Sequence, residues 1–135
     1  MLPPANRLKH DREFSAVYRK GIRRNSRHLT LRSLRNSNKS EWDRQQTSLN
    51  SLSATRIGIS ISLKVSKRSV VRNRIKRQIR AALRQMLPRL SPGWNLVIVV
   101  RPTAEECNYA EFLQELEQLL AQAEVLNGHT RGSLL

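Results

Sequence analysis

The spacing of apolar side chains predicts three amphipathic helices, at about Arg12–Lys20, Ser69–Leu87 and Tyr109–Ala123. In each segment apolar residues recur at intervals of three and four, which places them on one face of a helix. We expect Asp11 to cap the first helix and Gly21 to end it in the left-handed conformation. The apolar stripes comprise Phe14, Val17 and Tyr18 in the first helix, Val71, Ile75, Ile79, Ala82 or Leu83, and Met86 in the second, and Phe112, Leu113, Leu116, Leu119, Leu120 and Ala123 in the third.

Three other segments carry the patterns of β-strands. Apolar and polar residues alternate in Leu29–Arg35 and in Arg56–Ser62, which predicts strands with one face on the core. Apolar residues are continuous in Trp94–Arg101, which predicts a buried strand that Pro102 ends. The order helix, two strands, helix, strand, helix indicates an α+β fold, an α-β sandwich built on one sheet.

Residues 36–54 separate the first two predicted strands and differ in composition from the rest of the chain. Ser, Asn, Gln and Lys dominate this segment, so its burial does not offset the entropy lost on ordering. We therefore expect one domain over residues 1–123 with a mobile loop at about 36–54. From Glu124 onward the helical pattern stops, and we expect residues 124–135 to form a flexible tail.

Charge is distributed unevenly along the chain. Residues 1–101 carry 24 Lys/Arg and 4 Asp/Glu, a balance of +20, whereas residues 102–135 carry 1 and 6, a balance of −5. A positive field of this size indicates a polyanion as partner, and nucleic acid is the default candidate. A membrane surface is the alternative, but the longest apolar run, Leu96–Val100, is far shorter than the roughly 20 residues that span a bilayer. The first residues lack the layout of a signal peptide and Cys107 is the only cysteine, so we expect a cytoplasmic chain without an internal disulfide.

The helix predicted from Ser69 carries the strongest candidate for a binding surface. Arg72, Lys76 and Arg80 recur every four residues and therefore form one basic ridge, with further polar candidates at Asn73, Arg74 and Arg77. Arginine forks grip phosphate oxygens in pairs, and an asparagine amide can reach a phosphate or a 2′-hydroxyl. A merely solvated helix face normally carries acidic partners four residues away. This ridge has none, which favours nucleic-acid binding.

Two further features suit a nucleic acid without defining a site. Phe14 and Tyr18 share a helix face, where they either pack in the core or stack on unpaired bases, worth about 1–3 kcal/mol per base. The spacing of these two residues alone favours packing in the core. A second basic group surrounds the end of that helix and lacks periodicity, which indicates unspecific attraction of phosphates. Its members are Arg19, Lys20, Arg23, Arg24 and Arg27.

Side chains that could perform catalysis or bind a metal are sparse. Of the four carboxylates in the basic region, Glu41 and Asp43 lie in the predicted loop, where a site is poorly preorganised. The three histidines, His10, His28 and His129, lie far apart and show no metal-ligand spacing. A glycine-rich phosphate loop is also missing. We therefore expect no catalytic residue and no cofactor bound by the protein itself.

One stretch of the chain is similar to a known family. Residues Arg56–Arg80 read RIGISISLKVSKRSVVRNRIKRQIR, which resembles the signature of the bacterial ribonuclease P protein, and Arg72–Arg77 match its RNR segment. The segment Asn6–Lys9 and the apolar face of the first predicted helix resemble the opening of the same family. The likeness covers about residues 6–35 and 56–123.

The resemblance implies an α-β sandwich with a mixed four-stranded sheet, in the order α-β-β-(β)-α-β-α, and a left-handed crossover around the RNR helix. It implies that the chain binds ribonuclease P RNA, which holds the catalytic Mg²⁺, and the 5′ leader of precursor tRNA, with no membrane and no obligatory protein partner. The chain would then be a subunit of an endoribonuclease whose RNA performs the reaction. The residues that would bind the RNA subunit are Arg72, Asn73, Arg74, Lys76, Arg77 and Arg80. The family's leader cleft lies between the first helix and the sheet, and we place Phe14, Tyr18, Arg32 and Lys64 in it.

The chain departs from the family's pattern at three places. Arg32 stands at the position of a third cleft aromatic, where a phosphate contact would replace a stack and make leader affinity more salt-dependent. Leu63 precedes Lys64 where two lysines are common, which removes one basic contact. Ser66 stands where glycine is usual, which changes the turn before the RNR helix.

Three other classes of protein remain as alternatives. A ribosomal or RNA-chaperone protein with a similar sandwich would associate with ribosomal RNA and leave tRNA leaders unaffected. A DNA-binding helix protein is less favoured because the basic ridge is long and uniform, which does not suit base readout. A protein-only nuclease is disfavoured by the shortage of carboxylates.

Overall fold

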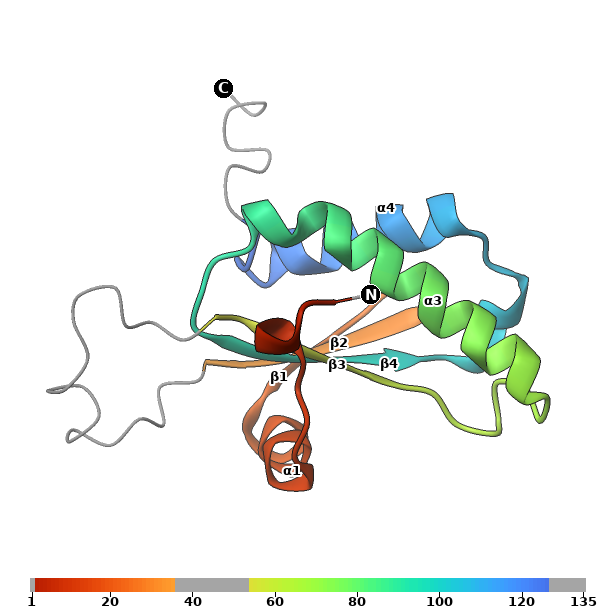
Figure 1. Cartoon of the computed structure of the whole chain (residues 1–135), viewed down its shortest axis with the longest axis horizontal. Coiled ribbons are helices and arrows are strands. Elements are labelled where there is room, and N and C mark those ends of the chain that lie inside the picture. The colour runs from red at the N-terminus through yellow and green to blue at the C-terminus, as the bar shows by residue number, and fades with distance from the viewer. Residues whose placement is uncertain (1, 36–53, 127–135) are drawn as a thin grey trace, which may run out of the picture.

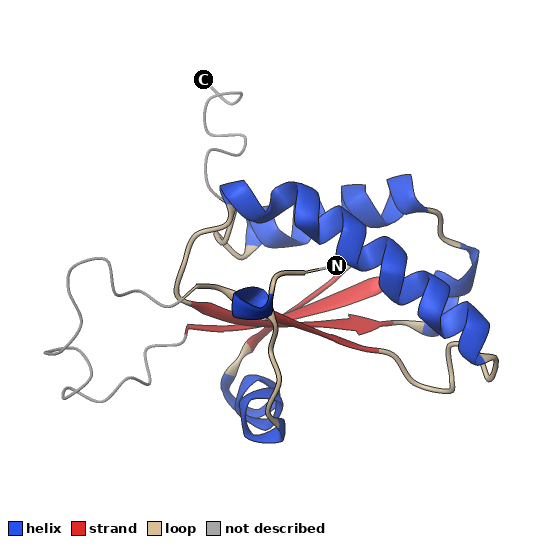
Figure 2. Cartoon of the chain, viewed as in Figure 1, coloured by secondary structure: helices blue, strands red, loops and turns tan. Residues whose placement is uncertain are grey.

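The computed structural model describes residues 2–35 and 54–126, which form one sheet with helices on both of its faces (Figures 1 and 2). In Figure 1, α3 and α4 cover one face and α1 lies on the opposite side. The elements in chain order are the 3-10 helix η1 (Pro4–Asn6), α1 (Asp11–Lys20), β1 (Ile22–Asn25), β2 (Leu29–Arg35), β3 (Arg56–Ser60), α3 (Ser69–Met86), the 3-10 helix η2 (Leu87–Arg89), β4 (Trp94–Val100), the 3-10 helix η3 (Pro102–Glu106) and α4 (Tyr109–Gln122). The expected loop at 36–54 lies, apart from Ala54, outside the described residues.

The sheet has the strand order β1-β2-β4-β3, in which β3 and β4 are parallel and the other pairs are antiparallel. The expectation of a mixed four-stranded sheet in an α+β fold is confirmed. Helix α3 connects the two parallel strands, and the left-handed sense of this crossover stays a prediction. Strand β1 was not predicted from the spacing of apolar residues, because its sequence Ile-Arg-Arg-Asn does not alternate. It forms an edge strand whose pairing with β2 runs from Ile22 opposite Ser33 to Asn25 opposite Thr30.

The main core lies between the sheet and the two long helices. The predicted stripes of α3 and α4, except for the partly buried Leu113, are buried there against Leu29, Leu31, Leu96 and Ile98 of the central strands. Each such side chain contributes about 1.5–3 kcal/mol on burial. A smaller cluster on the opposite face contains Leu8, Val17 and Val97, with Phe14, Leu34 and Val99 packed against it. This second cluster attaches α1 to the sheet.

Both ends of α1 differ from the prediction. The residue that caps it is His10 rather than Asp11, and the backbone N–H of His10 donates to Glu13 Oε1 at 3.3 Å. Gly21 has a φ of −75°, which is extended and not left-handed. Glycine is needed there for space, because a Cβ would lie 2.9 Å from the Ser33 carbonyl oxygen and closer still to that of Val17. Strand β1 can therefore follow the helix directly.

The chain does not fray at Glu124. Val125 and Leu126 are buried in the main core, and the N–H of Ser91 donates to the carbonyl of Val125 at 2.7 Å. The expectation of a flexible tail is therefore wrong for residues 124–126, because the end of a helical pattern carries no information on contacts that the following residues make with the core. Residues 127–135 lie outside the described part of the chain.

Candidate nucleic-acid interface

The burial of one face of α3 determines where its basic side chains lie. Val71, Ile75 and Ile79 belong to the main core, so the residues that follow each of them lie at the rim of the helix. Half-buried at this rim are Arg72, Lys76 and Arg80, which lie in one row; Arg74 is half-buried on the opposite flank of the helix, and Asn73 and Arg77 are exposed between them. We call these six residues together the α3 basic face.

Two arginines near the start of α3 are held by backbone carbonyls. Arg72 Nη1 donates to the carbonyl of Ser66 at 2.8 Å, and Arg74 Nη2 donates to that of Glu105 at 3.0 Å. Each guanidinium has five N–H donors, so most of them stay available to a ligand. Ser66 also stabilises the turn before α3, because its hydroxyl accepts from the N–H of Arg68 at 3.2 Å.

Carboxylates do not neutralise the α3 basic face. Helix α3 contains no Asp or Glu. Within the described ranges, the ion pairs are His28–Glu115, Arg56–Glu13 and Arg89–Glu117, and none of them involves α3. The positive charge of this face is thus uncompensated and favours a polyanionic ligand.

A cleft of about 240 Å³ lies beside this face, between α1, the N-terminal segment and strand β3. The ring of Phe14 lies so close to Gly58 that a Cβ there would be 2.6 Å from Phe14 Cε1. Leu8 adds an apolar wall, and Arg7 and Arg80 add positive charge. An aromatic edge flanked by cations suits a nucleotide, since the ring contacts the base while the cations attract phosphates.

The other predicted cleft residues lie outside this cavity. Arg32 Cζ is 4.9 Å from the centroid of the Tyr18 ring, and Arg32 Nη1 donates to the carbonyl of Tyr18 at 3.2 Å. This cation–π contact covers one face of the ring, and Tyr18 remains 37% exposed. Lys64 is exposed in the loop between β3 and α3. The structure therefore joins Phe14 with Arg80 and Tyr18 with Arg32, but it does not gather all predicted cleft residues in one cavity.

Sequence reasoning missed Arg7 and Gly58 as residues of the cleft. Arg7 Nε donates to the carbonyl of Leu2 at 2.8 Å, and Arg7 forms an isolated parallel bridge with Ile57 at the sheet edge. Arg7 also lines an adjoining cavity of about 350 Å³. The likeness of the N-terminal segment to the family was the signal for Arg7. The role of Gly58 could not be predicted, because an alternating strand pattern is recognised by its apolar side chains alone.

Groups that could hold a metal do not occur on this surface. In the part of the chain that the structure describes, one set of three candidate ligands exists, formed by His28, Cys107 and Glu115. It involves α4, the turn before β2 and the residue after η3. Among the described helices, none combines the length and the apolar character needed to cross a membrane.

The fold and this surface define a class of protein: a small, basic α+β protein with a positively charged helix face beside a cleft that contains an aromatic ring. The family model for Ribonuclease P matches residues 2–124. The ribonuclease P protein component of Trichormus variabilis is 58% identical over 138 residues, covering 96% of this chain and 99% of that protein. That of a Cyanothece species is 59% identical over 131 residues, covering 96% of this chain and 100% of that protein.

Solved structures agree with this comparison. The RNase P protein of Staphylococcus aureus has a TM-score of 0.71 at 25% identity, covering 94% of this chain and 96% of that one. The RNase P protein of Thermotoga maritima shares the fold, with a TM-score of 0.67 at 19% identity, covering 86% of this chain and 96% of that one. The chain belongs to the bacterial ribonuclease P protein family and is thus a protein subunit of a ribonuclease.

Proposed function

We propose that this chain binds the RNA subunit of ribonuclease P through the α3 basic face and the 5′ leader of precursor tRNA through the adjoining cleft. The position of Arg80 is the observation that supports this proposal most directly. It belongs to the basic ridge of α3 and also lines the cleft that contains Phe14. The two surfaces are therefore continuous, and one small protein can hold two RNA strands next to each other.

On the α3 basic face, the arginines bind phosphates of the RNA subunit. Arg72 and Arg74 are already positioned by backbone carbonyls, so they lose less conformational entropy on binding. Lys76 and Arg77 add charge along the same face, and Asn73 offers an amide to a 2′-hydroxyl.

In the cleft, the single-stranded leader supplies a base to Phe14 and phosphates to Arg7 and Arg80. Base stacking on an aromatic ring tolerates every base, which suits a leader whose sequence varies among tRNAs. Tyr18 offers its uncovered ring face, while Arg32 supplies a charge where the family has an aromatic. Lys64 extends the positive track from the loop before α3.

We assign the chemistry to the RNA subunit, as the family resemblance implies. Mg²⁺ requires oxygen ligands, usually carboxylates or phosphates. Helix α3 offers no carboxylate, so its face does not fit a Mg²⁺ site and the RNA phosphates would supply the ligands. The protein's own contribution is electrostatic: its cations reduce the repulsion between the two RNAs, so that less divalent metal is needed.

The test is removal of the 5′ leader from a precursor tRNA by a bacterial ribonuclease P RNA at low Mg²⁺, with and without this chain. We expect strong stimulation that disappears when the substrate has no leader. In the variant Arg80→Gln, the leader-dependent stimulation should fall about tenfold, because one charge-assisted contact is lost. Stimulation that is equal for leaderless substrate would refute the cleft assignment. No stimulation at all would favour the ribosomal or RNA-chaperone alternative.

A further inference from the structure

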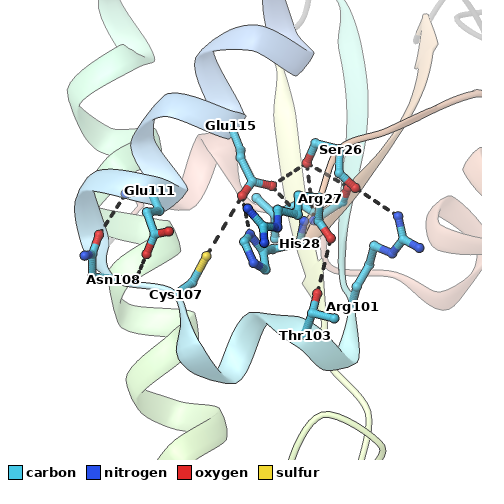
Figure 3. Close-up of polar contacts among 10 residues, drawn as sticks. Ser26, Arg27, His28, Arg101, Thr103, Cys107, Asn108, Glu111 and Glu115 are labelled. Atoms are coloured by element: carbon cyan, nitrogen blue, oxygen red, sulfur yellow. Dashed lines mark hydrogen bonds and ion pairs between the residues drawn. The ribbon is translucent and has the colours of Figure 1, made fainter.

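The side chains of His28, Cys107 and Glu115 come from separate segments and lie close together next to the turn that precedes β2 (Figure 3). His28 Nδ1 lies 2.5 Å from Glu115 Oε2, and Cys107 Sγ lies 3.9 Å from the same oxygen. The three donor atoms lie within 4.8 Å of one another. His28 and Cys107 are buried and Glu115 is half-buried. A nitrogen, a thiol sulfur and a carboxylate oxygen are the three donor types that Zn²⁺ accepts in proteins.

The carboxylate of Glu115 is held in place by hydrogen bonds to its other oxygen, Oε1. Glu115 Oε1 accepts from the hydroxyl of Ser26 at 2.5 Å and from the N–H of His28 at 2.9 Å. The turn is fixed in its place because Arg101 Nη1 donates to the carbonyl of Ser26 at 2.9 Å. Such outer contacts orient the ligands of metal sites and preserve their geometry. Oε2 is consequently directed at the imidazole and the thiol before any metal arrives.

A cavity of about 330 Å³ opens beside this cluster, lined by the turn that contains Ser26 and His28 and by the exposed side of α4. Gln114 and Gln118 are among its lining residues, so polar side chains form part of its wall. The cavity gives an ion a route from solvent and leaves room for a water molecule as a further ligand.

We propose that His28, Cys107 and Glu115 bind one Zn²⁺ ion, with water from the adjoining cavity as the fourth ligand. In a tetrahedral zinc site, donor atoms lie about 3.3–3.6 Å apart. The thiol and carboxylate are already near that separation, and the imidazole and carboxylate must separate by less than about 1 Å. The residues differ from those assigned to RNA binding, so the proposal does not depend on that function.

A cation would change the charge balance within this cluster. Burial, followed by the charge of the Glu115 carboxylate, raises the pKa of the Cys107 thiol to about 12. Burial acts to raise the pKa of Glu115 as well, but hydrogen bonds from Ser26 and His28 outweigh it and lower that pKa. Zn²⁺ reverses the repulsion between sulfur and carboxylate, because the thiolate and carboxylate then neutralise its two charges. Binding releases the Cys107 thiol proton to solvent, and it uses the His28 tautomer that carries its ring proton on Nε2 and leaves Nδ1 free to bind the metal.

The full chain, prepared without metal, provides a direct test with Co²⁺ as a spectroscopic substitute for Zn²⁺. Because Cys107 is the only cysteine, a thiolate-to-cobalt charge-transfer band reports this residue alone. We expect one equivalent of Co²⁺ to produce the band, and one equivalent of Zn²⁺ to abolish it and raise the thermal unfolding midpoint. The variants Cys107→Ser and Glu115→Gln should each weaken Zn²⁺ binding about tenfold or more, whereas His10→Gln, outside the cluster, should leave it unchanged.

Circular dichroism of each variant separates loss of metal binding from loss of folding. The Co²⁺ and Zn²⁺ titrations of the unsubstituted chain do not depend on the folding of any variant. Co²⁺ binding without a thiolate band would overturn the proposal. Zn²⁺ binding that Cys107→Ser leaves intact would overturn it as well, since the metal would then occupy another site.

Discussion

At the scale of single residues, the contact between Phe14 and Gly58 determines the shape of the cleft. Sequence spacing left Phe14 open to two roles, packing in the core or stacking on a base. The structure gives it a partly buried position, with the ring against Gly58 and the small cluster of Leu8, Val17 and Val97. Only a residue without a side chain allows the ring to lie this close to β3. The position of the ring in the cleft therefore depends on a glycine that the strand pattern did not single out.

The substitution Gly58→Ala should lower the free energy of unfolding by about 1–3 kcal/mol, because the new Cβ overlaps the Phe14 ring. Without that clash, alanine would be the better strand residue and would stabilise the protein. Urea unfolding of Gly58→Ala, Phe14→Leu and the double variant measures the coupling energy between the two positions. We expect the double variant to recover part of the stability that Gly58→Ala loses. Ser60→Ala on the same strand serves as control, with a change within about 0.5 kcal/mol. Unchanged stability in Gly58→Ala would mean that Phe14 moves freely.

At the scale of elements, α4 ends in a motif that continues beyond its last helical residue. The N–H of Glu124 donates to the carbonyl of Ala121 at 3.0 Å, and that of Val125 to the carbonyl of Leu120 at 2.9 Å. These two bonds, with Val125 buried, form a Schellman motif that brings the chain back onto the core. Glu124 has a φ of 64°, a left-handed conformation that favours glycine.

Replacing Glu124 by glycine should therefore stabilise the protein by about 1 kcal/mol, since the strain at the left-handed position is removed. Part of any gain would come from removing a negative charge at a helix C-terminus. Glu124→Gln removes that charge and keeps the strain, so the difference between the two variants isolates the backbone effect. Thermal unfolding of both variants measures it. A Gly variant no more stable than the Gln variant would contradict the left-handed conformation.

At the scale of the whole molecule, the charge pattern sets the strength and the salt sensitivity of binding. The positive balance of residues 1–101 includes the α3 basic face, whose charges have no carboxylate partner in the described chain. The negative residues are concentrated near the C-terminus, where Glu117 pairs with Arg89 and Glu115 with His28. Each positive charge on the α3 face that contacts a phosphate releases a counterion on binding.

The double variant Lys76→Gln and Arg77→Gln should bind ribonuclease P RNA more weakly. Its affinity should also depend less on salt concentration. The slope of log affinity against log salt should decrease in magnitude by about 1.5–2, corresponding to two lost phosphate contacts. Arg89→Gln is the matched control, because Arg89 is engaged by Glu117 at 2.8 Å, and its slope should stay unchanged. Equal slopes for both variants would show that the α3 face is not where the RNA binds.

The sequence by itself determined the parts of this protein that depend on local periodicity. Backbone geometry fixes the helical and strand periods, so the stripes of α3 and α4 and the alternation in β2 and β3 predicted these elements to within a few residues. The same reasoning found the basic ridge, because residues four apart in a helix share a face in any tertiary context. The family resemblance added the mixed four-stranded sheet.

The tertiary structure decided what depends on contacts between distant segments. Strand β1 exists because β2 offers it an edge, and Gly21 is required because two carbonyls, that of Val17 in α1 and that of Ser33 in β2, leave no room for a Cβ. His28 and Glu115 are 87 positions apart, so their meeting with Cys107 had no signature in sequence spacing. The division of the predicted cleft residues between a cavity and a separate Tyr18–Arg32 pair likewise follows from how α1 packs on the sheet. Local patterns carry no information on such packing, because it is set by the fit of whole surfaces against one another.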